Sequence, residues 1–191
     1  MALADLRKLV HRQYQVRIYE YPASLPRTPG PDPPPGYTVK HLKTFDEVPP
    51  EIARVVMPGR FVDLMRWRMQ RGRASLLVVF DAKGDMASYC WIQSWKPYSR
   101  PLGKVAPRGR MVGFGWVSPD HRQRGLFTFM VRRAVIFVDP SEPPLGYAVI
   151  ENPITMRACE KADYAFIGEV RVRRVLWFLN FSTVVARPGS S

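Results

Sequence analysis

The chain carries the stretch Val117-Ser118-Pro119-Asp120-His121-Arg122-Gln123-Arg124-Gly125-Leu126-Phe127. The stretch begins where an apolar run, Met111 to Val117, ends, and it finishes where a helical pattern begins. A basic turn that contains glycine and connects a strand to a helix is typical of phosphate binding. Its backbone N–H groups point at the anion, and the helix N-terminus adds positive potential. The stretch therefore predicts a ligand that carries phosphate.

Length and charge limit the classes of partner. The 191 residues are enough for one domain with a sizeable core. The 29 Lys and Arg against 16 Asp and Glu give a net charge of +13, which favours nucleotide cofactors, nucleic acid or membrane headgroups. A coenzyme with about four negative charges would match only part of this excess, so a second substrate can be acidic too. A solvated basic surface is the alternative explanation.

Cysteine usage and hydropathy indicate a compartment. Cys90 and Cys159 both lie in apolar patterns and are too few for a disulfide framework, so a reducing compartment is expected. No run approaches 18 apolar residues, and the first 20 residues lack the apolar centre of a signal peptide. We expect a cytoplasmic protein without membrane insertion. The three His and two Cys show no metal-ligand spacing, so no metal is expected.

The N-terminal residues differ in pattern from the rest. Residues 1–36 are predicted to precede the main domain, 37–191. Residues 3–12 have the spacing of a short amphipathic helix, and residues 15–21 alternate as a strand. Residues 22–36 hold seven prolines and are predicted to form an extended loop or linker.

From residue 37 onward, strand and helix patterns alternate. The expected strands are 37–42, 75–80, 86–95, 110–117, 146–151 and a pair within 164–181. The expected helices are 50–56, 60–70, 123–138 and 152–162, with a loop over 96–108. This order predicts a mixed α/β (α+β) fold in which helices flank a central, mostly antiparallel sheet. An antiparallel meander comes first and a βαβα crossover later.

The quoted stretch resembles the acyl-coenzyme A loop of the GNAT superfamily of N-acyltransferases. The usual form there is hydrophobic-x-Pro-x-x-Arg/Gln-x-x-Gly-x-Gly/Ala. The chain matches it at Val117, Pro119, Arg122 and Gly125. It departs from the pattern at Phe127, where a small residue is commonest.

A second segment, residues 150–164, is similar to the strand-Asn-helix segment of the same superfamily. Asn152, Glu160 and Lys161 match the pattern, and Tyr164 takes the place of the usual aromatic residue. Asp163 stands where glycine usually ends the helix. One helix and one strand separate the two segments, as in the family, so the resemblance implies a GNAT-like fold.

The resemblance implies a donor, acetyl-CoA or another acyl-CoA, and the residues that hold it. Backbone N–H groups of residues 122–127 would bind the diphosphate, and the edge of strand 110–117 would pair with the pantetheine arm. Asn152 would contact that arm, although an Asn before Pro153 also suits a helix N-cap. The predicted donor-binding residues are Gly115, Trp116, Val117, Arg122, Gln123, Arg124, Gly125, Leu126, Phe127 and Asn152.

The catalytic residues are less clear from the pattern. Many relatives carry a Tyr that protonates the leaving thiolate, and the equivalent position here is Cys159. A buried structural Cys is the alternative, and the thiolate can also leave to water. Glu151 is the nearest acidic candidate for the base, and a water chain is its alternative. His121 suits phosphate binding better than proton abstraction.

The sequence favours an N-acyltransferase that moves an acetyl or other acyl group from acyl-CoA to a primary amine. One alternative is an inactive module of the same fold that binds coenzyme A. Another is a nucleic-acid binder, suggested by the charge and by aromatic residues among basic ones at Trp67-Arg68 and 174–178. The resemblance also implies that the amine acceptor meets residues 43–72, whose pattern does not identify it. A homodimer remains open.

Overall fold

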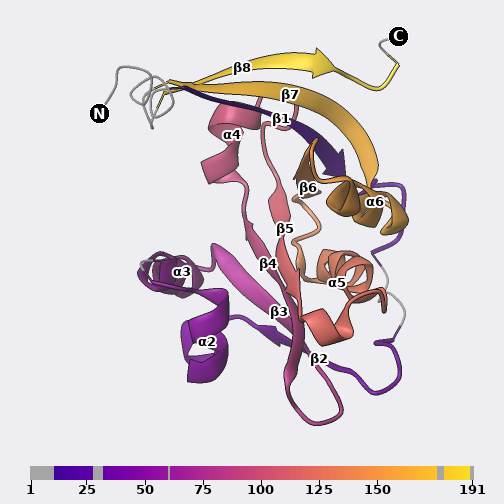
Figure 1. Cartoon of the computed structure of the whole chain (residues 1–191). Helices are drawn as coiled ribbons and strands as arrows, with labels where there is room; N and C mark the ends of the chain where they lie inside the picture. Colours follow the sequence, from indigo (N-terminus) through magenta and orange to yellow (C-terminus); the bar gives the residue numbers. More distant parts are fainter. Residues whose placement is uncertain (1–10, 28–31, 60, 176–178, 190–191) are drawn as a thin grey trace.

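The computed structural model describes residues 11–27, 32–59, 61–175 and 179–189. Eight strands form one sheet (Figure 1). The strands are β1 (His11–Glu20), β2 (Thr38–Leu42), β3 (Ala74–Phe80), β4 (Met86–Ser94), β5 (Arg110–Val117), β6 (Pro144–Val149), β7 (Ala165–Val175) and β8 (Leu179–Ala186). The α-helices are α2 (Pro50–Val56), α3 (Phe61–Gln70), α4 (Lys96–Leu102), α5 (Leu126–Ala134) and α6 (Pro153–Lys161), and the 3-10 turns are Phe45–Glu47, Pro119–His121 and Val135–Phe137.

The strand order β2-β3-β4-β5-β6-β1-β7-β8 confirms the mixed, mostly antiparallel sheet. Among the described strands, only the pairing of β5 with β6 is parallel, and α5 connects those two strands. This is the crossover that the sequence predicts.

Strand β1 lies inside the sheet, between β6 and β7. It therefore belongs to the same sheet as the strands after residue 37, where the main domain is predicted to begin. Gln15 and Arg17 of β1 both hydrogen-bond the buried carboxylate of Glu169 on β7. The helix expected over 3–12 falls mostly on residues 1–10, which are outside the described part. His11 and Arg12 are strand, not helix.

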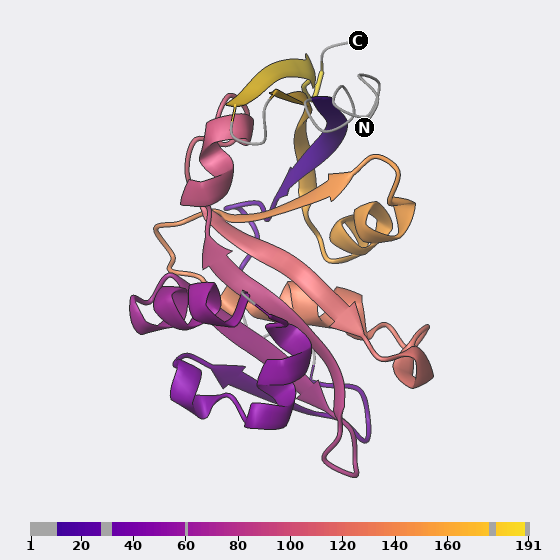
Figure 2. The same ribbon diagram turned by 60° about the vertical axis from the view of Figure 1, so that its left-hand side comes forward.

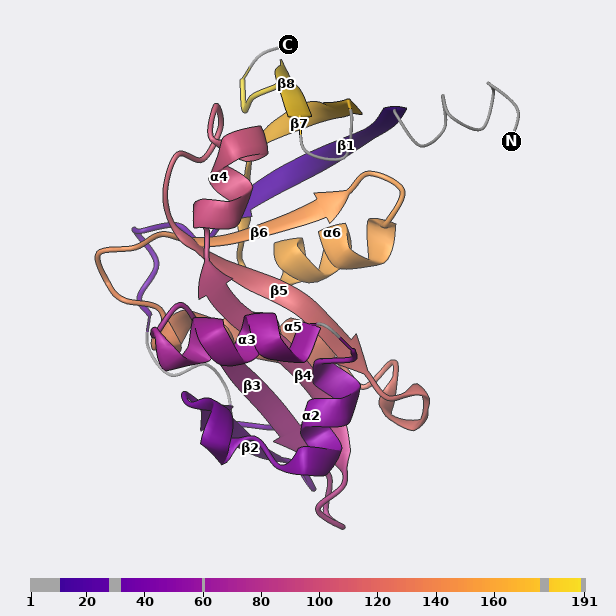
Figure 3. The ribbon, with the colours of Figure 1, turned by 90° about the vertical axis from the view of Figure 1, so that its left-hand side faces the viewer.

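Helices cover both faces of the sheet. Helices α2 and α3 lie on one face over β3 and β4, and α5 and α6 lie on the other (Figures 1 and 3). One core forms beneath α2 and α3, and a second forms between α5, α6 and the sheet. Helix α4 covers a third core over β5, β6, β1 and β7, on the same face as α3.

Two elements differ from the sequence-based expectation. The predicted loop 96–108 begins with α4, because Pro97 in its first turn lacks only an N–H that would be unpaired anyway, and Leu102 is buried in the core. The helix expected over 123–138 begins only at Leu126. Gln123 and Gly125 have left-handed backbones, with φ of 63° and 75°, which cannot continue a right-handed helix.

The divergence of β5 from β6 creates the main opening in the sheet. The two strands pair only at Arg110 with Pro144 and at Met111 with Leu145. Beyond these pairs they separate like the arms of a V, as Figure 2 shows. On the other side of β5, the register with β4 shifts, and Phe114 has a φ of 48°, a bulge that bends the strand. The rest of the β5 edge therefore faces a cleft instead of a strand.

Within the described residues, no helix combines the length and the apolar character needed to cross a bilayer.

Candidate functional site

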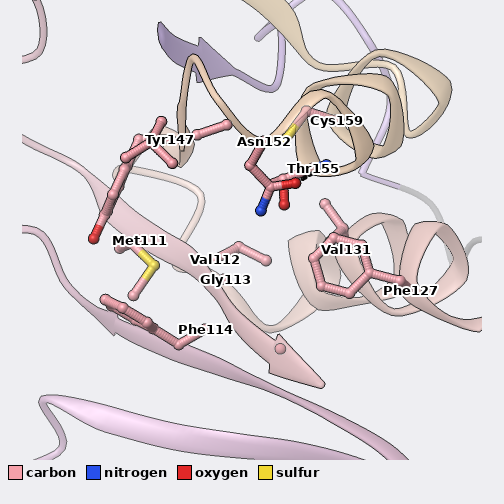
Figure 4. Close-up of a pocket in the computed structure, with 13 residues that line it drawn as sticks. Met111, Val112, Gly113, Phe114, Phe127, Val131, Tyr147, Asn152, Thr155 and Cys159 are labelled. Atoms are coloured by element: carbon pink, nitrogen blue, oxygen red, sulfur yellow. Dashed lines mark hydrogen bonds between the residues drawn. The ribbon is translucent and has the colours of Figure 1, made fainter. Parts of the chain in front are cut away.

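The cleft between β5 and β6 has a volume of about 340 Å³ (Figure 4). Side chains and backbone from β5, β6, α5 and α6 line it. The lining residues are Met111, Val112, Gly113, Phe114, Gly115, Phe127, Val131, Tyr147, Ala148, Val149, Asn152, Thr155 and Cys159. A narrow, mostly apolar cleft with a few polar groups is typical of a ligand site.

Residues from both faces of the sheet line the cleft. Val112 and Ala148 belong to the core under α5 and α6, whereas Met111 and Tyr147 belong to the core under α4. Successive residues of a strand point to opposite faces, so each strand supplies one side chain to each side of the gap. A ligand entering along α5 and a second ligand entering beside α4 can therefore meet in the gap.

The turn before α5 presents a row of backbone donors. The backbone N–H groups of residues 123–127 have no hydrogen-bond acceptor among the described residues. The left-handed backbone at Gln123 and Gly125 separates the turn from the helix that follows. Unpaired N–H groups at a helix N-terminus attract anions. The exposed Arg122 and Arg124 add positive charge at the same place.

A network of side chains connects this turn to the turn between β3 and β4. The phenol of Tyr37 lies 2.9 Å from Nδ1 of His121, whose Nε2 lies 3.6 Å from a carboxylate oxygen of Asp81. The guanidinium of Arg124 donates to the same phenol oxygen at 3.1 Å. Asp81 belongs to the turn between β3 and β4, so this network ties the basic turn to the sheet.

Polar groups of α6 face the opposite arm of the cleft. Asn152 caps the helix by accepting a hydrogen bond from the backbone N–H of Thr155 at 3.1 Å. This confirms the N-cap, which the sequence analysis gives as the alternative role of Asn152. The side chains of Asn152 and Thr155 both line the cleft. Cys159 lies one turn further along α6. Burial and the nearby Glu160 carboxylate raise the pKa of its thiol to about 12.

Comparison with known proteins was made by sequence and by structure. A scan against protein-family models and a search of curated proteins both found no match. Solved structures do match. A GNAT-family acetyltransferase from Colwellia psychrerythraea is 10% identical, with a TM-score of 0.56 over 86% of this chain and 56% of its own. A tandem GNAT protein of clavulanic acid biosynthesis is 15% identical, with a TM-score of 0.54 over 92% of this chain and 54% of its own.

A smaller enzyme shares the same architecture. The aminoglycoside antibiotic 6′-N-acetyltransferase from Acinetobacter baumannii is 13% identical, with a TM-score of 0.51 over 68% of this chain and 91% of its own. The chain has the GNAT fold. It spans a little over half the length of the Colwellia and clavulanic acid proteins, so these matches concern the fold alone.

Several of the residues predicted to bind the donor lie along the cleft or in the turn beside it. Gly115, Phe127 and Asn152 line the cleft, and residues 122–126 form the turn at its end. Trp116 stacks on Tyr89 with ring centroids 6.1 Å apart. The side chain of Leu126 is buried in the core, so only its backbone is available to a ligand.

Phe127, the residue at which the chain departs from the usual GNAT pattern, packs against Gly115. Its ring lies against Gly115, where a Cβ would come within 2.6 Å of the ring and 2.9 Å of the Tyr89 carbonyl oxygen. Phe127 therefore fills space beside β5 that a side chain at position 115 would occupy. Ordinary packing is enough to account for glycine at this position.

The two predicted catalytic residues lie in different surroundings. Cys159 lines the cleft, whereas Glu151 is exposed at the end of β6 and is not among the lining residues. A thiol with a pKa of about 12 is a poor proton donor to a thiolate of ordinary pKa near 8.5, by roughly three orders of magnitude. The cleft therefore favours neither residue for proton transfer, because the Cys159 thiol holds its proton too strongly and the Glu151 carboxylate lies outside the lining.

Sequence reasoning missed the aromatic group at the α4 side of the cleft. Tyr147 lines the cleft and packs against Tyr98 and Phe114, with ring centroids 5.6 and 6.1 Å away. Burial, together with the phenols of Tyr98 and Tyr14, raises the pKa of Tyr147 above its ordinary value. Its phenol thus stays protonated, and the residue borders the cleft. No local motif marks Tyr147, because its role depends on where β6 leaves β5.

Proposed function

We propose that this chain is an acyl-CoA-dependent N-acyltransferase that transfers an acetyl or other acyl group to a primary amine. The observation that supports this most directly is the combination of a V-shaped opening between β5 and β6 with a row of unpaired N–H groups at one end of it. A long donor with a diphosphate at one end and a thioester at the other matches this arrangement. Work in the reducing cytoplasm is part of the same proposal.

In this proposal the donor lies on the α5 side of the sheet. The backbone of residues 122–127, with Arg122 and Arg124, holds the diphosphate. The free edge of β5 near Gly115 and Val117 pairs with the amide groups of the pantetheine arm, and Asn152 and Thr155 contact that arm from α6. The thioester then lies in the gap, within reach of the face that α4 covers.

The chemistry requires one bond to form and one to break. The nitrogen of the neutral amine attacks the thioester carbon, the C–S bond breaks, and the new C–N bond remains in the amide product. The amine releases one proton to water, and the departing thiolate takes one up from water. Tyr147 donates a hydrogen bond to the charge that develops on oxygen or sulfur, and it suits this role because its raised pKa keeps the phenol protonated.

A second candidate is a GNAT-fold module that binds coenzyme A without catalysis. It is favoured by one observation: among the described residues that line the cleft, none is a carboxylate or an imidazole. Such a lining supplies no general base, and an acyltransferase of this kind must depend on water or on amines that are already neutral. Binding is common to both candidates, and only turnover separates them.

The test measures both properties on the same protein. Acetyl-CoA at about 100 times its dissociation constant should stabilise the fold by about 2.7 kcal/mol. Release of coenzyme A thiol over a panel of primary amines should then rise with pH as the amines lose their protons. Stabilisation without thiol release would favour the non-catalytic module. No stabilisation at millimolar acetyl-CoA would overturn the proposed function.

A further inference from the structure

A second hollow lies on the face of the sheet that α3 and α4 cover, and the donor path does not use it. Its volume is about 190 Å³. Helix α3, the segment before β3, and the junction of β4 with α4 form its walls. The lining residues are Leu64, Trp67, Arg68, Arg73, Ser94, Lys96 and Pro97.

Positive charge in this hollow is not balanced by the protein. Arg68, Arg73 and Lys96 all line it, and no acidic residue does among those described. Within the described residues, none of these three cations lies within 4 Å of a carboxylate oxygen. Cations that converge without a counter-charge attract an anion from solution.

Two of the three cationic side chains, Arg68 and Arg73, are also held in place. The guanidinium of Arg68 donates a hydrogen bond of 2.5 Å to the side-chain carbonyl of Gln93, which is almost completely buried. The guanidinium carbon of Arg73 lies 5.0 Å from the centroid of the half-exposed Trp67 ring, and that of Arg71 lies 4.7 Å from it. Such cation–π contacts restrain long side chains. These side chains therefore lose less conformational entropy when an anion binds.

The hollow is next to the cleft. Ser94, which lines the hollow, pairs across β4 and β5 with Arg110, the neighbour of the cleft residue Met111. Adjacent strands are about 4.8 Å apart. Tyr98 connects the two sites, because it interacts with Arg68 on one side and packs on Phe114 and Tyr147 on the other.

From this arrangement we propose that the hollow binds an anionic group of the acyl acceptor, so that the acceptor is an amine that also carries a carboxylate or a phosphate. The inference rests on the proposed acyltransferase function. The anion lies between Arg68, Arg73 and Lys96, the apolar part of the molecule lies against Trp67 and Leu64, and the amine reaches past Tyr98 into the gap. The acceptor enters on the face opposite the diphosphate of the donor.

The experiment compares amines that differ only in the anionic group. Suitable pairs are phenylalanine with phenethylamine, β-alanine with propylamine, and phosphoethanolamine with ethanolamine, each assayed by release of coenzyme A thiol at saturating acetyl-CoA. Amine pKa differs within pairs, so rates are compared at equal concentrations of neutral amine. We expect kcat/KM to be about 10- to 100-fold higher for the anionic member, as charge-assisted hydrogen bonds provide. Carboxylate and phosphate pairs separate the two sources of the anion.

Substitutions assign the effect to the hollow. The double variant R73Q/K96Q removes two of the three cations, and it should raise KM for the anionic amine about 10- to 100-fold while KM for acetyl-CoA stays unchanged. The matched control is R100Q, which removes an exposed cation from the same helix α4 but not from the hollow. The parent protein, R73Q/K96Q and R100Q should convert neutral amines at the same rate.

The outcomes distinguish this inference from the proposed function. If neutral amines are acylated as well as their anionic partners, the acceptor class is wrong and the acyltransferase function stands. If acetyl-CoA stabilises the protein but no amine releases thiol, calorimetry should measure how tightly both amines of each pair bind the coenzyme A complex. Equal affinity for the anionic and the neutral amine would overturn the inference. If acetyl-CoA neither binds nor reacts, the function fails and the inference fails with it.

Discussion

Aspartate and asparagine at position 125 would test whether the turn before α5 holds a diphosphate. Gly125 has a φ of 75°, and a Cβ there would meet no atom within 4 Å. Asn and Asp tolerate this left-handed backbone better than other residues, and they have almost the same shape. Ordinary side-chain capping needs an extended backbone at the N-cap, so neither side chain is expected to occupy the free N–H groups. The pair G125D and G125N therefore differs mainly by one negative charge.

The size of the effect follows from the charge. Two like charges about 5 Å apart repel by about 3 kcal/mol at an effective dielectric constant of about 20, and screening at this exposed turn reduces the value. We expect G125D to weaken coenzyme A binding by about 10- to 100-fold relative to G125N. Acetyl-CoA at about 100 times its dissociation constant adds about 2.7 kcal/mol, which is roughly 5–10 °C for a domain of this size. A 100-fold weaker variant should shift by only about 1 °C.

The assay is thermal unfolding of the parent protein, G125N and G125D, with and without the same concentration of acetyl-CoA. The unliganded melting temperatures of the two variants should agree closely, because their backbone strain is the same. G125N should keep most of the ligand-induced shift and G125D should lose most of it. Equal shifts in the two variants would show that no phosphate lies near Gly125, and the argument from the unpaired N–H groups would then be refuted.

Three further predictions concern the cleft and the core. Y147F should lower kcat about 100-fold, the typical effect of one lost transition-state donor, with KM for acetyl-CoA unchanged in thiol-release assays; an unchanged kcat would remove Tyr147 from the chemistry. Burial and the nearby Lys43 lower the pKa of His41 from 6.5 to about 4, so its contribution to stability is complete above pH 6.5 and is lost as the pH falls from 6.5 to 4. Urea denaturation should show that the free energy of unfolding falls by about 1–2 kcal/mol over this pH range, after allowance for partial exposure. The variant H41N should make the free energy of unfolding nearly independent of pH in the same range. G115A should destabilise the fold by about 1–3 kcal/mol in urea because its Cβ meets the Phe127 ring and the Tyr89 carbonyl. The double variant G115A/F127L should recover only part of this lost stability, since the contact with the carbonyl remains. Full recovery, or no loss in G115A, would contradict this packing.

Local signals in the sequence predicted much of the fold. Helix α2 has the predicted bounds Pro50–Val56, and β5 has the predicted bounds Arg110–Val117. The cap at Asn152 depends on neighbouring residues only, so a short pattern is sufficient to indicate it. The loop expected over 96–108 contains a helix, because the burial of Leu102 under the sheet outweighs the prolines in that segment.

What the chain determines by itself is the basic, glycine-containing turn before α5, the alternation of strands and helices and the positive charge, because each follows from nearby residues and from composition. Only the tertiary structure decides that β1 lies between β6 and β7, and that β5 and β6 part after two residue pairs. It alone brings Lys96 of α4 beside Arg68 and Arg73 in one hollow. These features depend on contacts between residues far apart in the chain, and no short stretch of sequence carries a record of them.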